Sequence, residues 1–224
     1  MITGIIASFI YIFVVIGIAT ILNKKGKLSK EGSRKCIHIL LSNWWFIAMY
    51  YFNTPLRAAF MPGIFVVVNY ISYKNNIFKA MEREGDNETL GTIYYAISLL
   101  ILSLITFSDG LSPWIGAAGI LVMGYGDGFA AIIGKTYGKH SLTFGSIKKS
   151  VEGSFAMFIF SFVILLAILI YTNSHNALVY AILISVVATL VELFSPNGTD
   201  NLLVPLVVSL LYYVLVFWEE CQTW

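Results

Sequence analysis

Apolar segments of about twenty residues recur along this 224-residue chain, and they restrict its fold more than any other feature. The hydrocarbon core of a bilayer is about 30 Å thick, so a helix of roughly 20 apolar residues crosses it. The chain is 58% hydrophobic and only 12% charged, whereas a soluble domain has about 25% charged residues. We therefore expect an all-α fold, a polytopic membrane bundle with about eight transmembrane helices.

The hydropathy pattern places these spans along almost the whole chain. Their expected ranges are 2–22, 36–52, 57–73, 90–107, 113–133, 152–171, 177–194 and 202–218. We expect residues 1–224 to form one integral membrane domain, in which the helix at 2–22 is peripheral to a core over about 30–210.

The distribution of basic residues predicts the orientation of these spans. Of the 14 Lys and Arg residues, only Arg57 does not follow the first, third or fifth span. Eight spans place the three loops concerned on one face of the membrane, and loops rich in Lys and Arg face the cytoplasm. We therefore expect a multi-pass protein whose termini are both non-cytoplasmic and whose polar motifs face the cytoplasm.

One dense polar segment, at residues 124–140, interrupts the apolar sequence. Within it, Asp127 lies between Gly126 and Gly128, near the cytoplasmic end of the fifth span. Packing of helices through small residues would explain the glycines but not the carboxylate. An ionisable group at this depth is functional by default, so a cation or proton role is the better interpretation of Asp127.

A second polar motif stands where the second span begins. Arg34 and His38 are four residues apart and share a helix face, and Lys35 lies beside Arg34. A basic anchor on anionic lipid is one interpretation. Phosphate binding is the better one for these three residues, because an anchor does not require a histidine one turn further into the membrane.

A third motif leads from a loop into the sixth span. Lys148, Lys149 and Ser150 precede Glu152 at the start of that helix. The free N–H groups of a helix N-terminus, its dipole and the lysines all favour a polyphosphate. Positive-inside anchoring is the alternative for the lysines.

The fourth motif joins the last two spans and adds more carboxylates. Glu192 ends the seventh span, and Asp200 and Asn201 open the eighth. Together with Asp127 and Glu152, these acidic residues supply the oxygen ligands that Mg²⁺ prefers. Carboxylates and cations on one membrane face are what metal-assisted phosphate transfer requires.

The chain has neither a G-x-x-x-x-G-K-S/T loop nor a kinase H-R-D set. We therefore expect the nucleotide to bind in a cytoplasm-facing cavity of the bundle and the acceptor to be a lipid. The expected partners are these two substrates and membrane lipids. We expect no nucleic-acid partner, and the oligomeric state stays open.

Three of these motifs, in chain order, resemble the polyprenol kinase family. They are Gly126-Asp-Gly with Gly134 and Gly138-Lys after it, Lys149-Ser-x-Glu-Gly-Ser154, and Asp200-Asn-Leu-x-Val-Pro205. The Arg34-Lys35-x-x-His38 sequence is similar to the N-terminal motif of that family, which comprises CTP-dependent dolichol kinases, phytol kinases and the yeast-type diacylglycerol kinase. The resemblance covers about residues 30–210 and implies a CTP-transferase-like core there.

The resemblance implies transfer of the γ-phosphate of CTP to the hydroxyl of a long-chain lipid alcohol, whether polyprenol or dolichol, phytol or diacylglycerol. The related CDP-diacylglycerol synthases carry Ser-Pro-x-Lys-Thr-x-Glu-Gly, whereas residues 145–153 lack that Pro and Thr. This difference favours a kinase. A cytidylyltransferase that makes a CDP-activated lipid is the alternative, and a transporter with an intramembrane carboxylate is the second.

These motifs predict roles for individual residues. We expect Mg²⁺, or another divalent cation, to be held by Asp127 with help from Glu152 or Asp200. His38 or Glu192 would accept the proton of the lipid hydroxyl, so both are catalytic candidates together with Asp127 and Glu152. The candidates for nucleotide binding, which are basic, small or at helix starts, are Arg34, Lys35, Gly126, Gly128, Gly134, Lys135, Lys139, Lys148, Lys149, Ser150 and Asn201.

Overall fold

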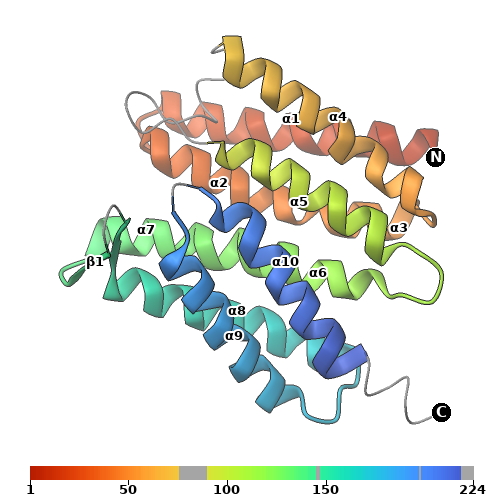
Figure 1. Cartoon of the computed structure of the whole chain (residues 1–224). Helices are drawn as coiled ribbons and strands as arrows, with labels where there is room; N and C mark the ends of the chain where they lie inside the picture. Colours follow the sequence, from red (N-terminus) through yellow and green to blue (C-terminus); the bar gives the residue numbers. More distant parts are fainter. Residues whose placement is uncertain (76–89, 145–146, 197, 218–224) are drawn as a thin grey trace.

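The computed structural model describes residues 1–75, 90–144, 147–196 and 198–217, and helices lying side by side make up most of them (Figure 1). The α-helices are α1 (Ile2–Lys24), α2 (Lys30–Ser42), α3 (Trp44–Tyr51), α4 (Pro55–Asn75), α5 (Gly91–Thr106), α6 (Pro113–Leu121), α7 (Gly128–Tyr137), α8 (Val151–Tyr171), α9 (Ala177–Phe194) and α10 (Asp200–Tyr212). Two π-helical segments, η1 (Val122–Asp127) and η2 (Tyr213–Phe217), follow α6 and α10.

Within the described residues, five helices are long and apolar enough to cross a membrane. They are Ile2–Lys24, Pro55–Asn75, Pro113–Tyr137, Val151–Tyr171 and Ala177–Phe194. Two shorter apolar helices, Gly91–Thr106 and Asp200–Val216, fall on the fourth and eighth expected spans. The count of eight and the orientation of the termini stay predictions, and the basic residues Lys79 and Arg83 lie outside the described residues.

The expected span at 36–52 is broken into two helices at Asn43. The side-chain amide of Asn43 donates to the carbonyl oxygens of Ile39 and Leu40, at 3.3 and 3.2 Å. Asparagine competes in this way with the backbone ladder and favours helix ends. The N-terminal half, α2, begins at the Ser29 cap and carries the basic motif.

A two-stranded antiparallel hairpin, β1 (Ser141–Phe144) and β2 (Ile147–Ser150), separates α7 from α8. The expected all-α class is therefore wrong for this segment, and the described chain is mostly helical. The segment lies between two apolar helices and pairs its backbone groups locally, with Leu142 opposite Lys149. The first residue of α1 and the end of η2 lie at the end of the bundle away from this hairpin (Figure 1).

The continuous helix formed by α6, η1 and α7 is the centre of the bundle. Of its most apolar 18-residue window, 78% is buried, against 22–39% for the other four candidate spans. It packs against α2, α8 and α10. Helix α1, expected to be peripheral, packs against α2 and α3. Any ionisable side chain on the inner face of the central helix is therefore surrounded by protein.

Candidate functional site

Asp127 is the last residue of η1, so it lies where the central helix changes from π-helical to α-helical geometry. Single π turns inside α-helices occur frequently at functional sites. The Asp127 side chain is buried, and the Lys35 ammonium donates to its Oδ2 at 2.5 Å. Lys35 reaches it from α2, 92 positions earlier in the sequence.

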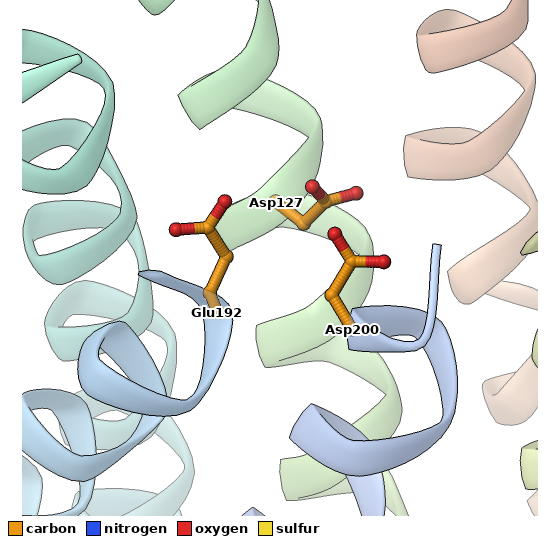
Figure 2. Close-up of side chains that lie close together, drawn as sticks. All are labelled: Asp127, Glu192 and Asp200. Carbon is orange, nitrogen blue, oxygen red and sulfur yellow. The ribbon is translucent and has the colours of Figure 1, made fainter. Parts of the chain in front are cut away.

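Three buried carboxylates meet at this point. Glu192, in the last turn of α9, and Asp200, the first residue of α10, each place a carboxylate oxygen within 4.8 Å of the other and of an Asp127 oxygen. Figure 2 shows the three carboxyl groups turned toward a common space, one from the central helix and two from the ends of neighbouring helices. We call Asp127, Glu192 and Asp200 the carboxylate centre.

Lys149 of β2 contacts two members of the carboxylate centre. Its ammonium group donates to Glu192 Oε1 and lies 3.6 Å from Asp200 Oδ2. Burial lowers the pKa of Lys149, but the negative charges of Glu192, Asp200 and Asp127 outweigh burial, and the pKa lies above its ordinary value. Lys149 is therefore protonated and acts as a fixed positive charge.

The charges of the carboxylate centre do not cancel. Two ammonium groups, Lys35 and Lys149, contact three carboxylates. Arg34 interacts electrostatically with Asp127 and Asp200, but its guanidinium group donates two hydrogen bonds to the Glu31 carboxylate, at 2.5 and 3.0 Å. With all three carboxylates ionised, one negative charge is left over in a space surrounded by oxygen atoms.

Asn201 adds an unsatisfied acceptor beside this centre. Its backbone N–H donates to Asp200 Oδ1 at 2.9 Å and its side-chain amide donates to Gly198, whereas its Oδ1 is buried without a partner in the described part of the chain. Carboxylate and amide oxygens are ligands of Mg²⁺ and Ca²⁺. The donor set and its excess negative charge therefore fit a divalent cation.

A cleft with a largely apolar lining and a volume of about 70 Å³ lies beside the carboxylate centre, between α1, α2, α4 and α5. Its polar lining residues include Arg34, Asn69 and Thr92, and the Asn69 amide ties α4 to α5 by donating to the Thr92 carbonyl at 3.0 Å. His38 also lines the cleft, and its ring stacks on Tyr95 with a centroid distance of 4.6 Å.

His38 connects the cleft with the carboxylate centre. Lys35 and His38 are one turn apart on α2, as are Asp127 and Met123 on the central helix. Lys35 contacts Asp127, and His38 Nε2 lies 2.6 Å from Met123 Sδ. The cleft and the Lys35–Asp127 pair are therefore joined by residues about one helical turn apart on α2.

Comparison with known proteins decides the family. A phytol kinase of Synechocystis sp. is 32% identical over 222 residues, covering 96% of this chain and 90% of that protein. A chloroplastic phytol kinase 1 of Arabidopsis thaliana is 33% identical over 214 residues, covering 86% and 69%. The chain belongs to the polyprenol and phytol kinase family. This confirms the family that the motifs resemble.

A chloroplastic farnesol kinase of Arabidopsis thaliana is 26% identical over 214 residues, covering 87% of this chain and 68% of that protein. No protein-family model and no solved structure matches the chain.

Glu152, expected as a metal ligand of this kinase family member, lies elsewhere. It is in the first turn of α8, where its carboxylate contacts His140 Nδ1 at 2.8 Å and accepts from the His140 N–H at 3.4 Å. The hairpin next to α8 holds it there. The third carboxylate of the centre is instead Glu192, which the sequence motifs placed among the possible oxygen ligands of Mg²⁺ but for which we expected a role in proton transfer.

The expected basic cluster is also divided. Lys135, Lys139 and Lys148 are exposed, whereas Lys149 reaches the carboxylate centre. Successive strand residues point to opposite faces, so Lys148 and Lys149 cannot both face inward. Ser150 caps α8 by accepting from the Gly153 N–H at 3.1 Å, so its hydroxyl stabilises the helix start.

The glycines of the Gly-Asp-Gly motif contact neighbouring helices, and their expected role in nucleotide binding stays a prediction. A Cβ at Gly126 would lie 2.6 Å from Met157 Sδ, and one at Gly128 would lie 2.8 Å from Ile39 Cδ1. Gly134 is similar, with Ser150 Oγ at 2.8 Å. Small residues here allow the close helix packing that positions Asp127.

We expect Gly128→Ala to destabilise the protein and Gly17→Ala to be neutral or stabilising. The added methyl at residue 128 would overlap Ile39, and overpacking costs about 1–3 kcal/mol. Nothing lies within 4 Å of a Cβ at Gly17, so only the better helix propensity of alanine acts there. Thermal unfolding of both variants in the same detergent measures the difference, and equal midpoints would contradict the packing role.

Proposed function

We propose that this protein is a lipid alcohol kinase that transfers the γ-phosphoryl group of CTP to the hydroxyl of an isoprenoid-type alcohol. The observation that carries the proposal is a buried carboxylate–lysine centre one helical turn from an apolar cleft. Relatives named as phytol and farnesol kinases support the same class of reaction. A triphosphate and a hydrophobic alcohol need two such sites side by side.

In this proposal Asp127, Glu192 and Asp200 hold a divalent cation, Mg²⁺ being the one usual for phosphoryl transfer. When bound, the cation supplies positive charge that neutralises the phosphate oxygens. Lys35 and Lys149 contact the carboxylate centre through Asp127 and Glu192, and they offer further positive charge to the phosphates. Their contribution is positioning and electrostatic stabilisation of the transferring group.

The reaction forms a bond between the oxygen of the alcohol and the γ-phosphorus. The bond between that phosphorus and the β–γ bridging oxygen breaks, and CDP leaves. The proton of the hydroxyl moves to the His38 imidazole in this scheme, because His38 lines the cleft whereas Glu192 is bound by Lys149. The sequence left both residues open as acceptors.

The proposal includes a multi-pass topology with the site at the cytoplasmic face, where CTP is present. The loops rich in Lys and Arg support this orientation. Accessibility of single cysteines introduced at exposed Lys139 and at exposed Tyr50 to a membrane-impermeant thiol reagent tests it. In intact cells the cysteine at position 50 should react and the cysteine at position 139 should not, and the opposite pattern would reverse the orientation.

Radiolabelled nucleotides test the activity. We expect purified protein in mixed micelles with phytol or farnesol to move label from γ-labelled CTP into lipid, and chelation of divalent cations with EDTA to abolish the transfer. Transfer from γ-labelled ATP instead would correct the donor. Transfer of label from α-labelled CTP to an added lipid phosphate, with release of pyrophosphate, would identify the cytidylyltransferase alternative.

A further inference from the structure

We infer that the cleft between α1, α2, α4 and α5 binds the hydrocarbon tail of a single-chain alcohol, with the hydroxyl held at His38. This inference rests on the proposed function and specifies its acceptor. It excludes two-chain lipids such as diacylglycerol, which the sequence left open.

The lining of the cleft fits an uncharged tail. Among the described residues that line it, Arg34 is the only Lys, Arg, Asp or Glu. Along α5 the lining runs from Gly91 to Leu99, and along α4 from Met61 to Asn69. Eight residues of helix rise about 12 Å, so the cleft follows the helices for that distance. The polar residues Asn69 and Thr92 lie toward one end and Met61 and Leu99 toward the other.

A hydroxyl-bearing ligand would satisfy an unpaired polar atom in this lining. The Tyr95 side chain is 7% exposed, and its Oη is buried without a hydrogen-bond partner in the described part of the chain. Buried polar atoms nearly always have a partner, so an exception requires an explanation. The Tyr95 ring stacks on His38, which places a phenol and an imidazole together in a cleft with a largely apolar lining.

The size of the cleft decides between one tail and two. A volume of about 70 Å³, with walls from four helices, admits the first part of one chain. Diacylglycerol carries two acyl chains next to its hydroxyl, so both would have to enter together. A prenyl alcohol carries one chain, and its remaining carbons can extend into the bilayer, because the cleft is shorter than the hydrocarbon core of about 30 Å.

Filling the cleft tests the inference by kinetics. Ala96 is 2% exposed and lines the cleft, so Ala96→Phe would occupy the space of the tail. We expect the KM for phytol to rise about tenfold or more while the KM for CTP changes little, since small changes in an apolar pocket discriminate by about 10–200-fold. Val67 lies on α4 and is 57% exposed, so Val67→Phe is the control and should leave both KM values unchanged.

Two measurements on the unaltered protein do not depend on how a variant folds. We expect phosphorylation of phytol and farnesol but not of 1,2-diacylglycerol, and a diazirine-bearing prenol to crosslink to Phe65, Ala96 or Leu99. Equal phosphorylation of diacylglycerol, or labelling confined to lipid-facing positions such as Val67, would overturn the inference while leaving the kinase intact. If no lipid alcohol is phosphorylated at all, the proposed function fails instead.

Discussion

Asp127→Asn should lower the kcat of lipid phosphorylation by roughly 10²- to 10³-fold, the loss typical when one preorganised electrostatic group is removed from a transition state. Asp127 is the member of the carboxylate centre that lies on the central helix, and it contacts Lys35 at 2.5 Å. The amide keeps the shape of the side chain but removes its charge. Transfer of label from γ-labelled CTP to phytol measures the effect. The variant should also need a higher divalent cation concentration for half-maximal activity.

Loss of fold is separated from loss of chemistry by a second variant. Asp127→Asn leaves the buried Lys35 ammonium without its partner, and breaking a buried ion pair in this way costs about 3–5 kcal/mol. Replacing Lys35 by methionine in the same chain removes that unpaired charge. The double variant should recover thermal stability but not activity. Asp109→Asn, in the exposed loop between α5 and α6, is the matched control, and full activity of Asp127→Asn would refute the metal assignment.

Hydropathy was sufficient to locate the helices, because each apolar run must satisfy its own backbone hydrogen bonds. It could not find the break at Asn43, which depends on side-chain hydrogen bonds to Ile39 and Leu40. The hairpin at residues 141–150 was also missed. Its strands have four residues each, too short to give a periodic signal.

The acidic residues of the site could be found from the sequence, but not their grouping. Asp127 lies within the central helix, whereas Glu192 and Asp200 lie at the ends of α9 and α10. Only the packing of α10 against the central helix and of α9 against α10 brings the three carboxylates together. Glu152, like Glu192, is a glutamate near the end of an expected span, yet a local contact with His140 holds it outside the carboxylate centre. Charge and position along the chain do not distinguish these two outcomes.

The cleft gave no signal at all in the sequence. Residues such as Met61, Ala96 and Leu99 are apolar, as are most residues of every candidate span. Whether an apolar side chain faces lipid, another helix or an internal space depends on helix rotation, which hydropathy does not report. The carboxylates of the site were therefore open to prediction, whereas the cleft that we propose for the acceptor was not.

The sharpest comparison between sequence and structure is a pair of glutamates on neighbouring helices. We expect Glu192→Gln to lower kcat roughly 100-fold, because it removes one of the three buried carboxylates and the partner of Lys149. Glu152→Gln should stay within about threefold of the unaltered protein, as is usual for substitutions away from buried networks. Both substitutions conserve size, and both are measured with γ-labelled CTP and phytol.

A larger loss of kcat in Glu152→Gln than in Glu192→Gln would place the cation at the start of α8, beside the hairpin, as the Lys149-Ser-x-Glu-Gly-Ser154 motif alone suggests. Thermal unfolding separates loss of chemistry from structural damage. In Glu192→Gln, Lys149 still has Asp200 as a partner, which lies 3.6 Å away in the unaltered protein, so we expect little loss of stability. A midpoint close to that of the unaltered protein, together with a higher cation concentration for half-maximal activity, assigns the loss to the carboxylate centre. A Glu152→Gln variant with the same altered cation requirement would show instead that the hairpin moves and brings Glu152 to the phosphates.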